Sequence, residues 1–299
     1  MDPNALYAVL VLCARDVDKI FDGLRAAGDA GGNPPLPPAP DNTFGYLTQA
    51  NWRALGQLRC DDEFIQKGTN CYFGLMLQCI APDPPFAAGD FMVAVRGTVT
   101  PLEWVDDGLS EFPDYLTGNV GGVGTGFWGL YSSMTYAQLD GSNSLANPAQ
   151  VIIDLVKDPG GATRTLWVTG HSLGAALATY LTADLQKRAV GTSVAIKPYF
   201  FASPRPGTQD YADNYQASIP SYDLVNYVAD LDPNVPSNPP FYTLNGGGAS
   251  HNVHIIARAL PGAPAQGLDP MTNVANNHSP VTYARMLDPN NQVARRLNL

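Results

Sequence analysis

The hydrophobic positions of this chain fall into short apolar runs and longer stretches with helical spacing. Residues 91–95, Phe-Met-Val-Ala-Val, form an uninterrupted apolar run typical of a strand that is buried on both faces of a sheet. Similar runs recur in the second half of the chain. They predict further strands at residues 165–169, 194–201 and 224–228.

Other stretches have the features of helices. Residues 5–13 are apolar and follow Pro3 and Asn4, which suit a helix start. Asn147 supplies an N-cap and Pro148 a first helical residue for a second helix, which ends before Pro159-Gly160. Helices are also predicted at residues 49–58 and at residues 175–189, which are rich in Ala and Leu. The apolar stripe of the second helix is Val151, Ile152, Leu155 and Val156.

Strands that alternate with helices predict an α/β fold, with a mainly parallel central sheet and helices on both faces. The chain has 299 residues, 45% apolar and 15% charged, so it can bury a sizeable core. We expect one domain over residues 1–299, with an N-terminal helix. Residues 31–40 form a proline-rich connector, because prolines there forbid helix and sheet.

Charge excludes some classes of partner. The formal net charge is -10 and the pI is about 4.6, so the protein repels phosphate backbones and nucleic acid is not an expected partner. No apolar run reaches the roughly 18 residues that a transmembrane helix needs. Residues 1–4 lack the basic start of a signal peptide. A cytoplasmic location and secretion from a precursor with a leader both stay open.

Neither the cysteines nor the acidic residues near the N-terminus predict a metal site. Asp16-Val17-Asp18 with Asp22-Gly23 partly matches a calcium loop, but Ile20 occupies a ligand position and no glutamate follows in register. We predict no metal and no organic cofactor. The even number of cysteines permits up to two disulfides, and buried thiols fit equally well. The four are Cys13, Cys60, Cys71 and Cys79.

The motif with the clearest chemistry is Gly170-His171-Ser172-Leu173-Gly174, between the predicted strand at 165–169 and the helix at 175–189. In a G-x-S-x-G elbow the serine occupies a strained turn from strand to helix, and the flanking glycines allow close chain packing. Ala175 and Ala176 keep the next helix turn free of bulk. This context indicates that Ser172 is a nucleophile.

Several ordered blocks resemble the class 3 (fungal-type, triacylglycerol) lipases, a family that also contains feruloyl esterases, phospholipases A1 and diacylglycerol lipases. The resemblance covers roughly residues 90 to 285 and implies an α/β-hydrolase-type fold. The first 80 or so residues match nothing beyond an N-terminal helix. The blocks are Val95-Arg96-Gly97-Thr98 with Trp104 and Asp107, Gly126-Phe127 with Tyr131, the Ser172 motif with Ala175-Ala176, and Phe201-Ala202-Ser203-Pro204-Arg205.

Ester cleavage also needs an oxyanion hole, whose donors are worth about 3–4 kcal/mol each. One donor is expected to be the backbone N–H of Leu173, which follows the nucleophile. The resemblance implies Thr98 as the second, although Arg96-Gly97-Thr98 could simply end a strand. In the family, the segment that corresponds to residues 98–109 forms a lid. In this chain Leu102, Val105 and Leu109 give that segment an apolar stripe. Ordinary core packing explains such a stripe equally well.

A serine nucleophile requires a histidine base and a carboxylate that orients it. His171 directly precedes the serine, so the elbow should turn it away. His251 and His254 could bind a metal on a helix, but no third ligand is near and a surface or loop role is favoured. His278 begins a block, His-Ser-Pro-Val-Thr-Tyr, that resembles the C-terminal H-S-x-x-x-Y of the family. The resemblance therefore implies His278 as the base.

The carboxylate is either Asp230 or Asp232. The family pattern N-x-x-D-x-V-P has extra residues here, where the chain reads Asn-Tyr-Val-Ala-Asp-Leu-Asp-Pro-Asn-Val-Pro over 226–236. Counting from the strand favours Asp230, and counting back from Val235 favours Asp232. Only one of the two is expected to hold the imidazole, and Asp230 is slightly preferred.

The leading hypothesis is a carboxylic ester hydrolase, a lipase or esterase, that acts on acylglycerols or other fatty acyl esters through an acyl-enzyme. Its partners would be a small or lipid ester and, transiently, a lipid interface. Esterase activity on small or feruloyl-type esters is the nearest alternative. A non-catalytic binding protein with the same fold is another. Peptidase or acyltransferase activity also stays open, because a triad does not fix the acceptor.

Overall fold

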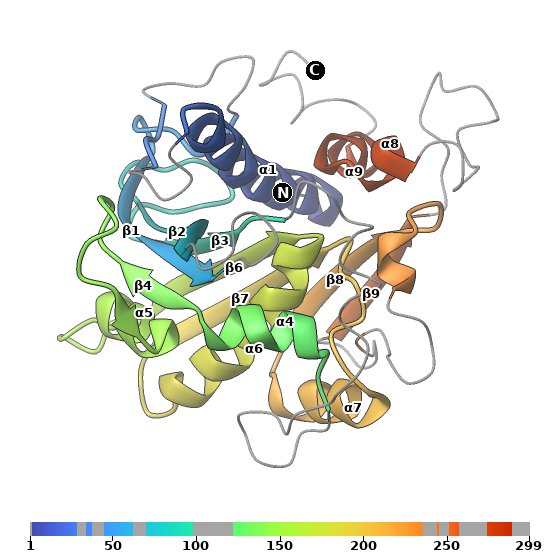
Figure 1. The fold of residues 1–299 in the computed structure, drawn as a ribbon. Coiled ribbons are helices and arrows are strands. Elements are labelled where there is room, and N and C mark those ends of the chain that lie inside the picture. Colours follow the sequence, from blue (N-terminus) through green and yellow to red (C-terminus); the bar gives the residue numbers. More distant parts are fainter. Residues whose placement is uncertain are drawn as a thin grey trace.

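The computed structural model describes residues 2–28, 34–37, 45–61, 70–97, 122–235, 244, 251–256 and 274–288. These residues form a nine-stranded sheet with helices on both faces (Figure 1). The elements in chain order are α1 (Pro3–Ala26), β1 (Trp52–Asp61), β2 (Asn70–Cys79), β3 (Phe91–Val95), α4 (Thr125–Ser132), β4 (Thr135–Ala137), β5 (Leu145–Ala146), α5 (Pro148–Val156), β6 (Arg164–His171), α6 (Leu173–Ala189), β7 (Val194–Phe201), α7 (Gln209–Ser218), β8 (Tyr222–Tyr227), the 3-10 turn η2 (Asp232–Asn234), β9 (His251–Ile256), α8 (Val274–His278) and α9 (Pro280–Leu287).

The sheet has a parallel half and an antiparallel half. Its strand order is β5-β4-β1-β2-β3-β6-β7-β8-β9. The strands β3, β6, β7, β8 and β9 pair in parallel. The strands β5, β4, β1 and β2 pair antiparallel with one another, and β2 pairs antiparallel with β3. Parallel neighbours need a crossover, which α5 and α6 supply, while β1 and β2 follow each other closely. The prediction of a mainly parallel sheet is therefore right only for the half that carries Ser172.

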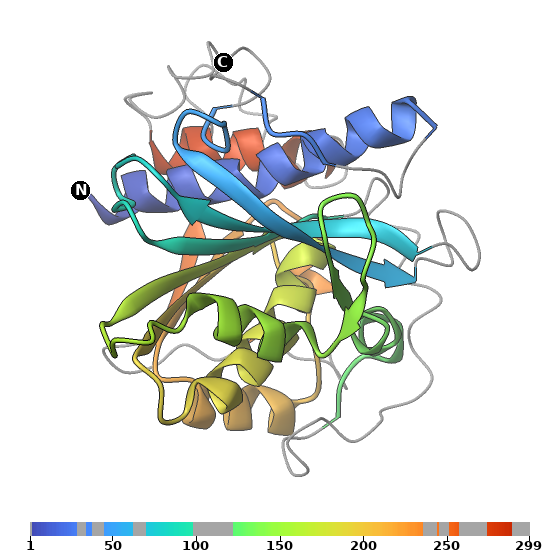
Figure 2. The same ribbon diagram turned by 90° about the vertical axis from the view of Figure 1, so that its left-hand side faces the viewer.

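The two faces of the sheet bury two different cores, because successive side chains of a strand point to opposite sides. In β3, Phe91, Val93 and Val95 pack with α4, α5 and α6, whereas Met92 and Ala94 pack with α1 and α9. Figure 2 shows α1 and α9 above the sheet and α5, α6 and α7 below it. The apolar run at 91–95 is thus a central strand, as predicted.

The prediction of a helix at residues 49–58 is wrong, because most of this segment lies in β1. Its Ala, Leu and Gln residues favour a helix in isolation, but β1 pairs with β2 along its length and with β4 on its other side. Gly56 fits this pairing, since a Cβ there would overlap the Tyr136 hydroxyl group. Pairing with distant strands overrides the local preference.

The predicted helix starts are right in position and partly wrong in detail. The helix α1 begins at Pro3, and the Asp2 side chain accepts a hydrogen bond from the Asn4 N–H at 3.1 Å. Asn147 precedes α5, but its side chain makes no capping hydrogen bond. The predicted stripe of α5 is displaced, since Leu155 is 42% exposed. The buried residues of α5 are Pro148, Ala149, Ile152, Ile153 and Val156.

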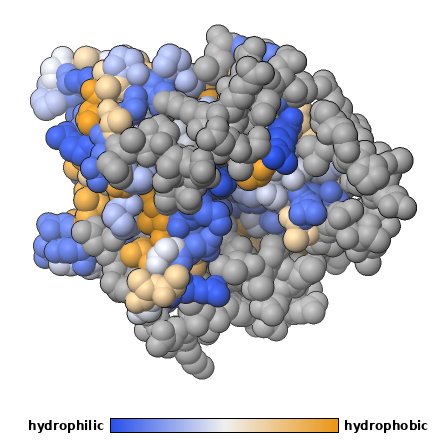
Figure 3. Space-filling view, turned by 90° about the horizontal axis from the view of Figure 1, so that it is seen from above, coloured by the Kyte–Doolittle hydropathy of each residue, from blue (hydrophilic) through white to orange (hydrophobic). Residues whose placement is uncertain are grey.

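The surface of the described residues mixes polar and apolar groups. Figure 3 shows hydrophilic and hydrophobic residues interspersed on the face that carries α1 and α9. Among the helices of the described ranges, none combines the length and hydrophobicity needed to cross a bilayer. All four cysteines are buried, and the structure shows no disulfide between them.

Candidate active site

Ser172 occupies a sharp turn between β6 and α6. The strand ends at His171 and the helix begins at Leu173, so a single residue makes the change of direction. Its backbone angles are φ 58° and ψ -133°, a conformation that a residue with a side chain rarely adopts. The Ser172 N–H donates to the carbonyl of Phe201 on β7 at 3.0 Å, which ties the strained turn to the sheet. Strain held in this way is characteristic of functional positions.

The two glycines of the motif allow the backbones around Ser172 to approach closely. A Cβ on Gly170 would overlap the carbonyl of Gly174, and a Cβ on Gly174 would overlap the carbonyls of Val95 and Arg96 at the end of β3. The glycine requirement inferred from the motif therefore has a specific cause in each case. The first turn of α6 and the end of β3 pack closely around Ser172, which lies at the carboxyl edge of the parallel strands.

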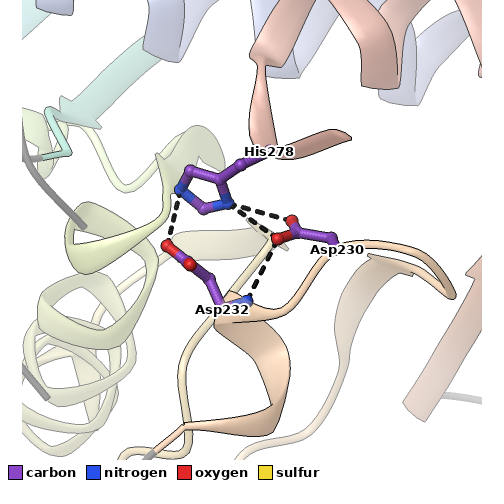
Figure 4. A group of neighbouring side chains, drawn as sticks. All are labelled: Asp230, Asp232 and His278. Carbon is purple, nitrogen blue, oxygen red and sulfur yellow. Dashed lines mark hydrogen bonds and ion pairs between the residues drawn. The ribbon is translucent and has the colours of Figure 1, made fainter. Parts of the chain in front are cut away.

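His278 and Asp230 form a buried pair beside this edge. The Nδ1 atom of His278 lies 2.9 Å from Oδ2 and 3.1 Å from Oδ1 of Asp230. Asp230 follows β8, and His278 ends the short helix α8 (Figure 4). The Asp230 carboxylate also accepts the Tyr283 hydroxyl at 2.7 Å and the Asp232 N–H at 3.1 Å. Three donors therefore fix this carboxylate, which is 1% exposed.

Asp232 reaches the opposite side of the same imidazole. Its Oδ2 atom lies 2.9 Å from Nε2 of His278, and the Ser172 hydroxyl is 3.5 Å from the same oxygen. The other oxygen, Oδ1, is buried and accepts no hydrogen bond from the described residues. Asp232 is thus held through one oxygen only, whereas Asp230 is held through both.

The expectation that only one aspartate could contact the imidazole is therefore wrong. Asp230 ends the loop after β8 and Asp232 begins the turn η2, so the two-residue spacing places one carboxylate on each ring nitrogen. Suitable donor atoms of Asp230, Asp232 and His278 all lie within 4.8 Å of one another. A metal ion bound by them would have to replace one of these contacts to the ring.

The two acids control the charge of the ring. Burial lowers the pKa of His278, but the hydrogen bonds and negative charges of Asp230 and Asp232 outweigh burial and raise it to about 10. In this arrangement His278 is protonated at neutral pH. Burial holds the pKa of His171 well below its usual range, and the charge of His278 lowers it further. The His171 ring packs 4.7 Å from that of His278, centroid to centroid.

The end of β3 lies directly against the elbow. A Cβ on Gly97 would come within 3.2 Å of the Ser172 Cβ atom and 3.1 Å of the His171 carbonyl oxygen. The next residue, Thr98, and the lid segment at 98–109 lie outside the described residues. Leu173 is the first residue of α6, so its N–H belongs to the initial N–H groups that have no acceptor within a helix.

The sequence motifs gave no role to two residues of the site, Tyr283 and Asn277. The Tyr283 hydroxyl donates to Asp230 and accepts the Tyr227 N–H at 3.0 Å, so it links α9 to the end of β8. Its place in the His-Ser-Pro-Val-Thr-Tyr block was the available signal. The Asn277 side chain donates to the carbonyl of Ala229 at 3.0 Å, and no spacing pointed to it.

His251 and His254 lie on the strand β9, so the loop and helix positions considered for them are wrong, while the surface role stays a prediction. The β9 backbone pairs with β8 over Tyr222–Tyr227. The side chains of these two histidines are outside the described residues.

A comparison with known families identifies the family of this chain. A family model described as lipase (class 3) matches residues 92–242, about half of the chain, and includes β3, the Ser172 elbow and both aspartates. The chain belongs to the class 3 lipase family. The matched region ends before His278, whose position comes from the fold.

Curated relatives share part of this region. Phospholipase A1-Igamma1, chloroplastic, of Arabidopsis thaliana is 26% identical over 178 residues, which is 54% of this chain and 31% of the relative. Phospholipase A1-II 1 of Oryza sativa subsp. indica is 29% identical over 159 residues, covering 49% of this chain and 39% of the relative. The chain thus spans well under half the length of these relatives.

Solved lipase structures match this chain and show that it has the α/β-hydrolase-type lipase fold. A deletion mutant of Rhizomucor miehei lipase in its propeptide complex matches with a TM-score of 0.59 at 16% identity, over 93% of this chain and 79% of that one. This match reaches beyond the family region and includes most of the chain. The likeness in fold therefore extends beyond residues 92–242.

Proposed function

We propose that this protein is a serine carboxylic ester hydrolase acting on fatty acyl esters, with Ser172 as nucleophile, His278 as general base and Asp230 as the orienting carboxylate. The observation that carries the proposal is the strained Ser172 turn beside a buried histidine and carboxylate pair. Membership of the class 3 lipase family supports it. The proposed roles follow the chain order Ser, Asp, His of this fold.

In the proposed reaction, His278 first loses its Nε2 proton to solvent, and Ser172 Oγ then attacks the ester carbonyl carbon while its own proton passes to Nε2. The protonated ring then gives this proton to the leaving alcohol as the carbon–oxygen bond breaks, which leaves an acyl-enzyme. Water next gives a proton to His278 and attacks the acyl carbon. The acid is released, and the serine oxygen takes its proton back from the ring.

The negative charge that develops on the carbonyl oxygen requires donors placed in advance. We assign the backbone N–H groups of Leu173 and Thr98 to this task. The first stands at the start of α6, where the helix dipole also favours negative charge. The second directly follows Gly97, which contacts the elbow.

Asp230 rather than Asp232 is proposed as the orienting acid, because its contact is with Nδ1 and three donors hold it in place. Asp232 occupies the position on Nε2 that the serine hydroxyl needs during proton transfer. A ring nitrogen that is protonated and ion-paired with Asp232 cannot accept the serine proton. Turnover therefore requires the Asp232 carboxylate to turn away, which its single held oxygen allows.

Fatty acyl esters are the favoured substrate class, since the relatives are named phospholipases A1 and the structural match is a fungal lipase. The class includes acylglycerols and phospholipids, and binding at a lipid interface is part of this proposal. Small or feruloyl-type esters are the alternative. A preference for short p-nitrophenyl esters, with no activation by an oil interface, would favour that alternative.

The test is hydrolysis of p-nitrophenyl esters of graded chain length by the wild type and by Ser172→Ala and Asp230→Asn. Ser193→Ala is the matched control, because Ser193 is exposed and precedes β7 at the opposite end of the parallel strands. We expect Ser172→Ala to lose labelling by an organophosphonate and nearly all activity, while Ser193→Ala keeps both. Full activity of Ser172→Ala would overturn the proposal.

The contact between Asp232 and Nε2 of His278 also favours a second candidate, a non-catalytic binding protein with the same fold. In that case Asp232 would block the base permanently. An absence of organophosphonate labelling in both the wild type and Asp232→Asn would favour this candidate. Labelling of the wild type at Ser172 would exclude it, whereas labelling of Asp232→Asn alone would show that Asp232 blocks the base.

A further inference from the structure

The N-terminal helix reaches the end of β3, next to the proposed oxyanion hole. Asp18 on α1 accepts a hydrogen bond from the Gly97 N–H, and its Oδ1 atom lies 2.8 Å from that nitrogen. The two residues are 79 positions apart in the chain, so the contact exists only in the folded protein. It joins a helix outside the family match to the strand end that carries Thr98.

Arg96 fixes the other polar group of Gly97. Its Nη1 atom donates to the Gly97 carbonyl oxygen at 2.7 Å, and its Nε atom donates to the Tyr72 carbonyl at 2.7 Å. The guanidinium group lies between the rings of Phe21 on α1 and Phe73 on β2, 3.7 and 3.9 Å from their centroids. Both backbone polar groups of Gly97 are therefore held by side chains.

This pair of contacts has a direct geometric consequence. A peptide group is planar, so a contact that orients the Gly97 carbonyl also orients the N–H that follows it, which belongs to Thr98. The Asp18 contact fixes the preceding peptide, and Gly97 itself lies against Ser172. The orientation of Gly97 beside the serine thus depends on α1 through Asp18 and on Arg96.

We propose that Asp18 is a positioning residue for the oxyanion hole, which holds Gly97 so that the following N–H is directed to the site beside Ser172. The inference rests on the proposed function, since it needs Thr98 as a donor. It gives the N-terminal helix a part in catalysis. Asp18 acts through its contact with Gly97.

The energetics of Asp18 fit a specific role better than simple packing. Burial raises the pKa of this carboxyl to about 7, and the Gly97 N–H and the charge of Arg96 offset only part of that effect. An apolar side chain would fill the same space without this desolvation cost. A carboxylate is useful here because it accepts the Gly97 N–H strongly while facing the Arg96 charge.

The same helix supplies a matched control. Asp16, two residues earlier, also accepts backbone N–H groups, from Gly45, Tyr46 and Leu47 at 2.9–3.2 Å. It anchors residues 45–47, whereas Asp18 holds Gly97 at the elbow. Removing Asp16 should therefore reduce stability in the way that removing Asp18 does, without changing the oxyanion hole.

The experiment compares Asp18→Ala, Asp18→Asn and Asp16→Ala in the full chain on one p-nitrophenyl ester, with active sites counted by organophosphonate titration. We expect kcat of Asp18→Ala to fall about tenfold or more while KM changes less than about twofold, a part of the 10²–10³ lost with a whole donor. Asp18→Asn should lie between, because its amide oxygen still accepts the Gly97 N–H. Asp16→Ala should keep kcat per active site.

Binding of an alkyl trifluoromethyl ketone supplies the second readout, because it forms a tetrahedral oxyanion with the serine. Its affinity should fall in Asp18→Ala by the same factor as kcat. Equal kcat in Asp18→Ala and Asp16→Ala, with an active wild type, overturns this inference and leaves the proposed function intact. A wild type without esterase activity overturns the proposed function and this inference together.

Discussion

The carboxylate of Asp232 and the Nε2 atom of His278 lie 2.9 Å apart, in the position that a catalytic serine hydroxyl would use. The Asp232 oxygen is also 3.5 Å from Ser172 Oγ, so the acid stands between the two groups that must exchange a proton. The structure thus combines a strained serine with a histidine that faces an acid on each side.

Replacing Asp232 by Asn should free the base at lower pH. Removal of the Asp232 charge lowers the pKa of His278, because an opposite charge at this distance raises it by about 1 to 3 units. The neutral imidazole then exists at lower pH. We expect the acidic limb of the profile of kcat/KM against pH to move down by at least about one unit in Asp232→Asn.

Asp223→Asn is the control for Asp232→Asn, since Asp223 is on β8 and bonds to the Tyr7 hydroxyl on the far side of the sheet from α6. Its profile should match the wild type. An acidic limb that stays in place in Asp232→Asn would show that Asp232 does not set the charge of the base.

The charged His278 should also make stability depend on pH. Its pKa is about 10 in the folded protein and about 6.5 in the unfolded chain, so the folded state binds the proton more tightly. The stabilisation is fully present below about pH 6.5 and is lost as the pH rises through about 10. Urea unfolding between pH 7 and 9.5 should show a falling free energy of unfolding, with a shallower fall in Asp232→Asn.

Tyr283→Phe should impair the site without blocking it. The change removes a hydrogen bond to the Asp230 carboxylate, which is worth about 1.5–3 kcal/mol for a charged acceptor, and it leaves the Tyr227 N–H without that partner. We expect kcat to fall about tenfold. Tyr180→Phe loses a buried hydrogen bond to the Pro206 carbonyl, away from His278, and should affect stability but not kcat. Equal kcat in the two variants would contradict a role for Tyr283 in holding Asp230.

Gly174→Ala should destabilise the protein. The added methyl group would overlap the carbonyls of Val95 and Arg96, and such overpacking costs about 1–3 kcal/mol. Gly129→Ala is the matched control, because nothing lies within 4 Å of a Cβ at this helical position and alanine favours a helix by about 1 kcal/mol. Thermal unfolding should show a lower Tm for the first variant and an unchanged or higher Tm for the second.

The elements that the sequence predicted correctly are those with a strong local signal. The apolar runs give β3 and β7 with their observed bounds, and they give β6 and β8 within a few residues. The strand β2 and the helices α4 and α7 had no predicted counterpart. The strand β1 was taken for a helix, because its pairing with β2 depends on residues that the local pattern does not include.

At the site, the motif identified the Ser172 turn because a strained turn needs glycines at fixed positions around it. The choice between Asp230 and Asp232 could not be read from spacing, since extra residues after β8 leave two ways to count. Only the fold shows that the two carboxylates reach opposite nitrogens of one ring.

The sequence by itself determined the strand and helix on either side of Ser172, the candidate base and the family resemblance, because these depend on short motifs and local periodicity. The tertiary structure alone decided the partners that come from distant parts of the chain: Asp232 at His278, Tyr283 at Asp230 and Asp18 at Gly97. Such contacts depend on how α1, β3, β8 and α9 pack together. A one-dimensional pattern of residues contains no measure of that packing.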